Sequence, residues 1–291
     1  MSDSTLPAIV ARPGSSAAEI DARAVAKMQR RRWIVLFWQI AILIGLIGGW
    51  EFTAERNIID PFFYSSPSAI WTRLWEMMTE GIEGISLWYH LWVTMEESVI
   101  GFVLGSLGGI GAGIALGRNR MLGDIFQVYI KTLNAIPRVI LAPIFALIFG
   151  YNIWAKVAVS FIMVFFVVFA NAFQGVREAD RAMIANAQIL GANKWQVTRA
   201  VILPSAMSWI FASLHISFSF AIVGAIVSEF VISNAGIGFV IQLARGLHDP
   251  ALMFASILVV LVVVLIAEWI MTRIEHRLAR WRPAPFQEGG T

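Results

Sequence analysis

Six long stretches of apolar residues constrain the fold of this chain more than any other feature. They cover residues 33–50, 91–116, 125–149, 154–173, 207–230 and 252–271. Each is long enough, as a helix, to cross a bilayer core of about 30 Å. With 58% hydrophobic and only 14% charged residues, the chain is also too apolar for a soluble protein. The sequence therefore predicts an all-α polytopic membrane protein with six transmembrane helices.

The third stretch differs from the others because it contains two basic residues and two prolines, namely Lys131, Pro137, Arg138 and Pro143. Charged side chains are costly in lipid, and proline cannot donate a backbone hydrogen bond. We therefore expect this helix to be broken or partly interfacial.

The distribution of lysine and arginine predicts the orientation. If both termini are cytoplasmic, sixteen of the 22 basic residues lie on the cytoplasmic side, four lie outside, and two fall in the third stretch. This bias follows the positive-inside rule. It also explains the basic charge balance, so we predict a lipid membrane as the chain's environment and no nucleic-acid partner.

The apolar stretches divide the chain into four predicted segments. Residues 1–32 form a disordered cytoplasmic tail, and residues 33–86 contain the first transmembrane helix and an outer loop with an interfacial helix at 68–79. Residues 87–274 form the transmembrane core, which includes a cytoplasmic loop at 175–204, and residues 275–291 form a cytoplasmic tail. The first apolar run exceeds a signal-peptide core and lacks a small-residue cleavage site, so we interpret it as an uncleaved anchor.

The chain offers no pattern for a metal or cofactor site. It has no cysteine, and its four histidines, His90, His215, His248 and His276, lack ligand spacing. We predict no disulfide, no metal and no cofactor.

Glycines recur every four residues in the second stretch, at Gly101, Gly105, Gly109, Gly113 and Gly117. They form overlapping G-x-x-x-G units on nearly one helix face, which predicts close packing against another helix of the same or a second subunit. The alternative is that glycine is simply common in membrane helices.

Two adjacent carboxylates, Glu96 and Glu97, lie in the same stretch. An ionised carboxylate facing lipid at the bilayer centre costs about 3 kcal/mol, so one or both should face protein or water. They could form a proton relay or cation site, or they could lie at the interface or bind a neighbouring polar group.

The fifth stretch carries a polar stripe in which Ser208, His215 and Ser219 share one helix face, widened by Ser213 and Ser217. These groups could line a translocation pathway. Serines in membrane helices also bond backbone carbonyls or hold helices together. We select His215 as the first residue to test because histidine is rarer at such depth.

The segment 175–204 is the only long, charged, helix-patterned segment between two apolar stretches. Asn193 and Gln196 have capping-box spacing, and Gly191 favours a break just before them. Pro204 is expected to end the segment because it donates no backbone hydrogen bond. The pattern predicts two short helices with a bend near Gly191, suited to a cytoplasmic partner.

These features resemble the inner-membrane permease subunits of binding-protein-dependent ABC importers, particularly the nitrate, sulfonate and taurine branch. The loop is similar to the family's EAA motif through Ala187, Gly191, Val201, Leu203 and Pro204, whereas Ala185 and Asn186 replace the motif's Glu and first Ala. Three further parts of the chain are similar to segments of that branch. The first is 134–138 together with Ala142-Pro143 and Phe149-Gly150, the second is Ser228-Glu229-Phe230 together with 236–239, and the third is 280–283. Ser213-Leu214-His215 stands where the branch carries Gly-Leu-Arg.

The resemblance implies a MetI-like ABC importer permease fold in the inner membrane. It also implies a homodimer of permeases, cytoplasmic ATPase subunits and an extracytoplasmic solute-binding protein. The chain lacks a G-x-x-x-x-G-K-[ST] P-loop, so ATP hydrolysis is expected in a separate subunit and the chain is not an enzyme.

The resemblance also suggests residue roles. ATPase coupling would use Ala187, Gly191, Ala192, Leu203 and Pro204. The translocation path of a small nitrate-, sulfonate- or taurine-like solute would use Pro137, His215, Ser219 and Glu229.

Two alternatives remain at this point. One is an ion-coupled secondary transporter with Glu96, Glu97 and Glu229 as its relay, although no repeated halves are evident. The other is a membrane scaffold or enzyme, but no nucleophile, base and orienting group are grouped at a recognisable spacing.

Overall fold

The computed structural model describes residues 17–278, and this part of the chain is built from helices with one isolated bridge between Ile82 and Ile85. The all-α prediction is therefore confirmed. The α-helices are α1 (Ala17–Glu55), α2 (Pro61–Tyr64), α3 (Pro67–Thr79), α4 (Leu87–Arg118), α5 (Arg120–Ala135), α6 (Leu141–Phe149), α7 (Ile153–Arg177), α8 (Arg181–Ile189), α9 (Lys194–Val197), α10 (Leu203–Ile232), α11 (Ile237–Leu247) and α12 (Pro250–Leu278). Two short non-α helices, η1 (Arg138–Ile140) and η2 (Thr198–Ile202), precede α6 and α10.

The chain divides into two compact units, residues 1–68 and 69–291. In the first unit, α1 begins at Ala17, so the prediction of a disordered tail is wrong for residues 17–32; residues 1–16 lie outside the described part. Residues 17–29 are rich in alanine and other strong helix formers, and they continue a helix already formed by the apolar run. The apolar window of α1 has no buried residue within the structure, which suits a lipid-facing helix.

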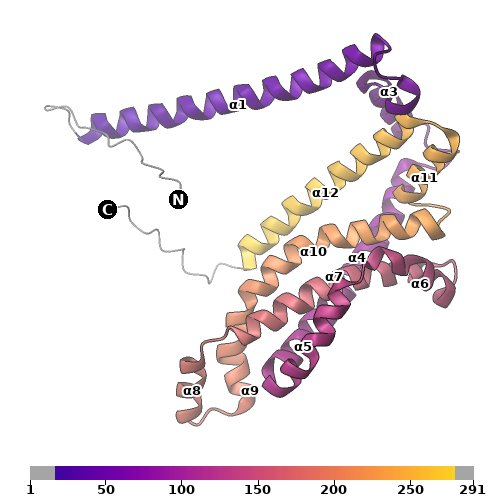
Figure 1. Ribbon diagram of the computed structural model, residues 1–291. Coiled ribbons are helices and arrows are strands. Elements are labelled where there is room, and N and C mark those ends of the chain that lie inside the picture. The colour runs from indigo at the N-terminus through magenta and orange to yellow at the C-terminus, as the bar shows by residue number, and fades with distance from the viewer. Residues whose placement is uncertain (1–16, 279–291) are drawn as a thin grey trace. The chain divides into compact units, whose positions relative to one another are not determined.

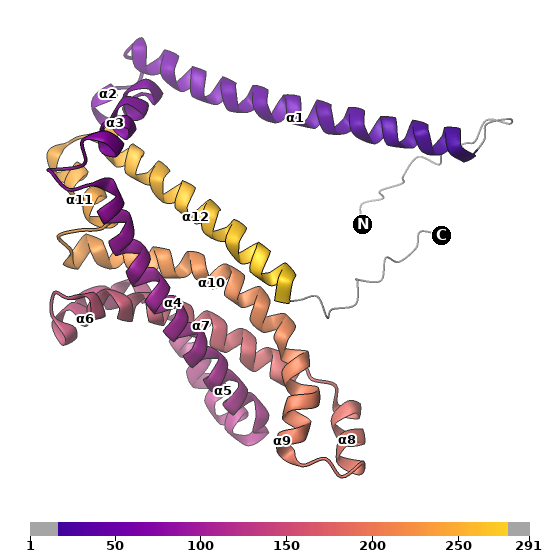
Figure 2. The same ribbon diagram turned by 180° about the vertical axis from the view of Figure 1, so that it is seen from behind.

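The core of the second unit consists of α4, α7 and α10, which lie side by side in both views (Figures 1 and 2). Buried small and branched side chains fill the space between α7 and α10. These are Val164, Val168 and Ala221 in one cluster, and Ala172, Val176, Ala206 and Ile210 in another. The predicted membrane core therefore packs as a three-helix layer with the remaining helices attached to it.

The glycine face of α4 lies directly against α7. A Cβ added at Gly105 or Gly109 would lie 2.8 Å from a backbone oxygen of α7, and one at Gly113 would lie 2.7 Å from Ala172 Cβ. Gly101 and Gly117 face the same helix, whereas Gly111 has nothing within 4 Å. The absence of side chains lets the two backbones approach, so the repeat is used within one subunit.

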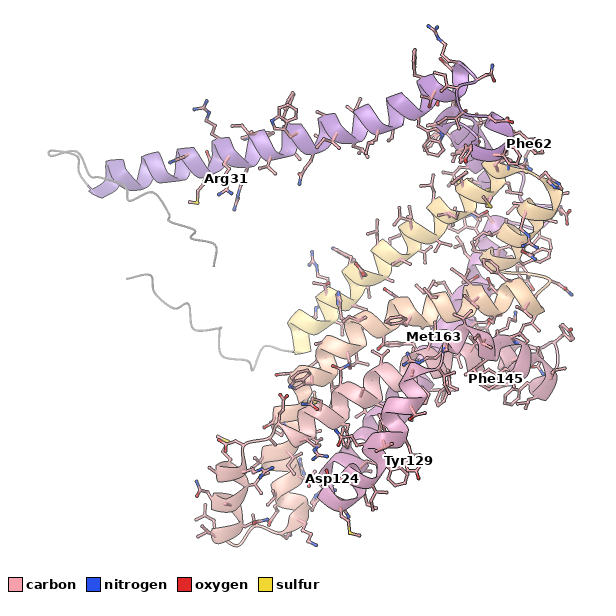
Figure 3. All side chains as sticks on the ribbon, in the orientation of Figure 1. Arg31, Phe62, Asp124, Tyr129, Phe145 and Met163 are labelled. Atoms are coloured by element: carbon pink, nitrogen blue, oxygen red, sulfur yellow. The ribbon has the colours of Figure 1, made fainter. Side chains whose placement is uncertain are left out.

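The third apolar stretch is interrupted, as expected. It forms α5 and then, after Pro137, η1 and α6. Proline lacks the amide hydrogen and disfavours helical geometry in the preceding residue, which explains a break between Ala135 and Arg138. Figure 3 shows Asp124 and Tyr129 on α5 and Phe145 on the separate helix α6.

Five helices of the described part are long and apolar enough to cross a membrane, namely Lys27–Glu55, Leu87–Arg118, Ile153–Arg177, Lys194–Ile232 and Pro250–Ile274. They correspond to five of the six apolar stretches, and the third stretch supplies the two shorter helices. The fourth of these helices runs through α9, η2 and α10 without a stop at Pro204. The wide π-type turn of η2 immediately before Leu203 changes the hydrogen-bond register, so the helix accommodates a proline that we expected to end the segment.

Candidate functional site

A cluster of buried polar side chains joins α4, α7 and α10 at the end of the bundle where α7 begins. We call His90, Thr94, Glu97, Lys156 and Glu229 the polar cluster. Glu97 and Glu229 are each only 1% exposed. Buried charges are stable only when they are paired and hydrogen-bonded, so the arrangement of their partners decides what this cluster can do.

The polar cluster binds the backbone at the start of α11. The Gly236 amide donates to His90 Nδ1 at 3.1 Å, the Ile237 amide donates to Thr94 Oγ1 at 2.9 Å, and the Gly238 amide donates to Glu229 Oε2 at 2.6 Å. The first amides of a helix have no partner within that helix. Here three side chains from α4 and α10 supply those partners, and the Glu229 carboxylate also lies at the favourable positive end of the α11 dipole.

Glycine is required beside Glu229 for two different reasons. Gly236 has φ of 110°, which other residues rarely adopt. A Cβ at Gly238 would lie 2.5 Å from a backbone oxygen of α10 and 2.7 Å from Glu229 Cβ. The Glu229 carboxylate and the glycines of 236–239 therefore form one structural unit, although they belong to separate helices.

The polar cluster also compensates the charge of its buried carboxylates. Lys156 Nζ forms an ion pair with Glu97 Oε1 and lies 3.1 Å from Ser233 Oγ. Its ammonium also acts electrostatically on Glu229, whose Oε1 accepts a 2.7 Å hydrogen bond from Thr94 Oγ1. One lysine thus faces two buried carboxylates. Of the two adjacent acids on α4, Glu97 joins the cluster and Glu96 is exposed.

A cavity of about 340 Å³ opens beside the polar cluster. Its polar lining includes Asn152, Lys156, Ser233 and Asn234. No group of three His, Cys, Asp or Glu side chains suited to a metal ion occurs among the residues that the structure describes. The cavity and the polar cluster thus border the connection between α10 and α11.

At the same end of this unit, Arg73 joins α3 to the turn before α12. Its guanidinium lies 2.8 Å from Glu76 and 3.1 Å from Asp249. The hydrogen bond to Glu76, assisted by the charge of Asp249, raises the pKa of Arg73 above its usual value. This half-buried network contributes modestly to stability, since ion pairs that solvent can reach give at most about 1 kcal/mol.

The segment 175–204 lies at the opposite end of the bundle (Figures 1 and 2). Asp180 caps α8, and Gly191 bends the chain with φ of 85°. Asn193 and Gln196 form the predicted capping box, with reciprocal bonds of 2.9 and 2.8 Å. The predicted pair of short helices with a bend near Gly191 is confirmed.

The outer surface of this segment is apolar at its tip. Ile189 is 82% exposed, Leu190 is 86% exposed, and Trp195 is exposed beyond the bend. Of the residues predicted from the EAA resemblance, Gly191 and Pro204 are exposed, whereas Ala187, Ala192 and Leu203 are half-buried. Exposed apolar side chains on a charged segment indicate a contact surface for another protein.

The residues predicted to line a pathway do not come together in one place. His215 and Ser219 are half-buried on α10, Pro137 is exposed at the break before η1, and Glu229 is buried in the polar cluster. Ser213 donates to the Ile210 carbonyl at 2.7 Å, which is the structural alternative considered for these serines. Pathway lining by His215, Ser219, Glu229 and Pro137 stays a prediction.

Sequence reasoning missed three members of the polar cluster. Lys156 is one of the four basic residues that the positive-inside count places outside, together with Arg56, Arg73 and Arg245, and neither Thr94 nor His90 has a predicted role. A lysine in the first turn of an apolar helix was an available signal for Lys156, because such a charge needs a partner. No local pattern identifies Thr94 or His90, since their partners lie 143 and 146 residues away in the chain.

Comparison with known proteins supplies the remaining finding. A family model described as "Binding-protein-dependent transport system inner membrane component" matches residues 105–280. The chain is 29% identical to the riboflavin transport system permease protein RibX of Chloroflexus aurantiacus, over 88% of this chain and 94% of that protein. It is 26% identical to the taurine transport system permease protein TauC of Escherichia coli, over 86% of this chain and 92% of that protein.

Among solved structures, an inward-facing MetNI methionine ABC transporter matches with a TM-score of 0.59 and 16% identity. The match covers 67% of this chain and 98% of that chain. At this identity the likeness concerns the fold, and it agrees with the predicted MetI-like architecture.

Proposed function

The chain belongs to the family of binding-protein-dependent transport system inner membrane components, the permease subunits of ABC importers, and we propose that α8 and α9 are the surface through which an ATPase drives it. Membership in this family means that the chain is a multi-pass inner-membrane subunit that carries solute across the membrane. It acts with separate ATPase and solute-binding partners and does not hydrolyse ATP itself. The importer prediction is confirmed, and the ion-coupled alternative is set aside.

The proposed orientation puts α8, α9 and both termini in the cytoplasm. Basic side chains gather at the α8–α9 end of the second unit, where α4 ends with Arg118, α7 ends with Arg177, and α9 and η2 carry Lys194 and Arg199. This agrees with the positive-inside rule. The polar cluster then lies toward the outside, where a solute-binding protein delivers its cargo.

The proposed coupling mechanism depends on one observation above all. A single run of helix extends from Lys194, directly after the N-cap residue Asn193, to Ile232, three residues beyond Glu229. Movement of α9 by an ATPase that contacts the exposed Trp195 would therefore be transmitted along α10 to the opposite end of the bundle. Rigid helices that shift as units are a common means of such transmission.

The proposed pathway is formed by two copies of the chain. His215 and Ser219 are half-buried on α10 in the single chain, so a second permease would complete a lining that one copy leaves partly open. We propose a homodimer, with Pro137, His215, Ser219 and Glu229 on or beside the path.

The proposed cargo is a small solute of the sulfonate or taurine type, on the basis of the similarity to TauC. RibX, with a similar degree of identity, makes riboflavin the first competitor to test. Uptake of both compounds should be compared in the same assembly.

Replacement of Gly191 tests the coupling proposal. In Gly191→Trp, the added Cβ meets nothing within 4 Å. The substitution therefore strains only the backbone of the loop, because tryptophan disfavours the positive φ by on the order of 1–2 kcal/mol. Membrane insertion should persist, while ATP-driven uptake by the complex with its ATPase and solute-binding protein should fall at least tenfold. Uptake is measured in proteoliposomes, and retention of the ATPase is measured by co-purification.

Two controls make the test specific. Gly191→Asn should retain uptake because asparagine tolerates positive φ, and Gly246→Trp adds the same bulk at an open position outside the loop. If Gly191→Trp transports normally while binding its ATPase normally, α8 and α9 are not the coupling surface.

A further inference from the structure

A second cavity lies at the α8–α9 end of the bundle, between the end of α4, the start of α5, and the α8, α9 and η2 segment. Its volume is about 680 Å³. Arg118 reaches it from α4 and Lys194 reaches it from the first position of α9, with Asn119 and Gln188 as further polar groups. The cavity therefore separates two parts of the chain that are 76 residues apart in sequence and carries positive charge from both.

The two cations have no counter-charge in the described part of the chain. No aspartate or glutamate lines the cavity, and neither Arg118 nor Lys194 forms an ion pair with a described acid. The nearby acid Asp124 of α5 is already bound to Arg177 at 2.8 Å. Like charges that share a cavity attract an anion, which lowers their mutual repulsion.

The hydrogen-bonding groups in the cavity are also suited to an anion. Asn119 Oδ1 accepts from the Leu122 amide at 3.2 Å, which leaves the Asn119 side-chain NH₂ as the part able to donate to a ligand. The guanidinium of Arg118 can bind two oxygens of a phosphate at once, and Lys194 can add a point charge. These donors match a tetrahedral oxyanion.

Most of the remaining lining is apolar, apart from Thr198, whose hydroxyl donates to the Lys194 carbonyl at 2.8 Å. Ala115, Leu122 and Ile202 line the same space, and Arg118 occupies the last turn of an apolar helix of 32 residues. A cavity at the end of a membrane helix, with cations and aliphatic side chains together, matches a lipid, whose phosphate and acyl chain need both surfaces.

We propose that this cavity binds a phosphate group, supplied by the headgroup of an anionic phospholipid, between Arg118 and Lys194. The proposal depends on the location in a membrane and is independent of the coupling role proposed for α8 and α9. A bound phosphate would connect the end of α4 to the start of α9 and would hold the loop against the bundle. The lipid would then be a stabilising component of the permease.

The test uses the full-length permease in mild detergent, with phosphatidylglycerol or phosphatidylcholine added, and native mass spectrometry as the measurement. Wild type should retain phosphatidylglycerol in preference to phosphatidylcholine. Arg118→Gln with Lys194→Gln should weaken that retention about tenfold or more, because each basic residue contributes on the order of 1 kcal/mol to binding an anionic lipid, or about fivefold. Arg181→Gln with Arg199→Gln removes the same charge from the α8–α9 end of the bundle, outside the cavity lining, and should change retention less than twofold.

A second variant keeps both cations and fills the space. Ile202→Trp should also lose the bound lipid, and this outcome separates a shaped cavity from a general electrostatic effect. Equal lipid loss in the two double variants, or full retention in Ile202→Trp, would overturn the site. If inorganic phosphate at about 10 mM, a concentration on the order of the Kd of a weakly bound soluble anion, displaces the lipid, then the lipid headgroup is not the source of the bound phosphate.

Discussion

Removal of the Lys156 ammonium is the most direct test of how the polar cluster holds the permease together. Lys156→Met keeps a long, flexible, apolar stem and deletes the charge. The substitution leaves Glu97 without its ion-pair partner and Ser233 without its 3.1 Å contact, while Glu229 loses an electrostatic partner. Both carboxylates are 1% exposed, so in the folded protein they depend on protein groups rather than on bulk solvent for charge compensation.

The expected loss of stability is large. Breaking a buried ion pair by removing one partner costs about 3–5 kcal/mol, because the remaining charge is buried without compensation. Loss of the hydrogen bond to Ser233 adds about 1 kcal/mol. We therefore expect the free energy of unfolding to fall by about 4 kcal/mol or more.

The assay is denaturant unfolding of the purified permease in detergent, followed by tryptophan fluorescence. Glu96→Gln is the matched control, since this exposed neighbour of Glu97 should leave the unfolding midpoint unchanged. Lys156→Met combined with Glu97→Leu should recover at least about 2 kcal/mol, because it removes the uncompensated charge as well. A single variant that is as stable as the Glu96→Gln control, or a double variant that is less stable than the single one, would refute this account of the cluster.

Two further predictions concern glycine packing. Gly105→Leu with Gly109→Leu should destabilise the permease by at least about 3 kcal/mol, because each added side chain would clash with the backbone of α7. Gly111→Leu is the control and should be tolerated, because its side chain projects into open space. Thermal unfolding of the detergent-purified proteins compares the variants, and equal unfolding midpoints would contradict the packing. Gly238→Ala should displace the first turn of α11 and lower the free energy of unfolding by about 1–3 kcal/mol. Amide hydrogen exchange should become faster only at residues 236–240. Protection equal to that of the wild type would show that the turn has room for a methyl group.

The local features of this protein follow from its sequence. The lengths of the apolar stretches identify the chain as a membrane protein and locate its transmembrane helices. This is because every helix that crosses a bilayer needs about 20 consecutive apolar residues. The interruption near Pro137 and the capping box at Asn193 and Gln196 are equally local, since each depends on hydrogen bonds within four residues. The helical start of α1 was missed because a polar composition was interpreted as disorder, although strong helix formers adjoined a stable helix.

Other features needed the tertiary structure. The glycine repeat predicts a close neighbour, but only the fold identifies that neighbour as α7 of the same chain. Glu229 was predicted beside a pathway, and the structure buries it against Thr94, 135 residues earlier in the sequence, and against the first turn of α11. The physical reason is that helix ends and buried charges must find partners wherever the fold brings donors and acceptors together. Sequence spacing alone does not carry that information.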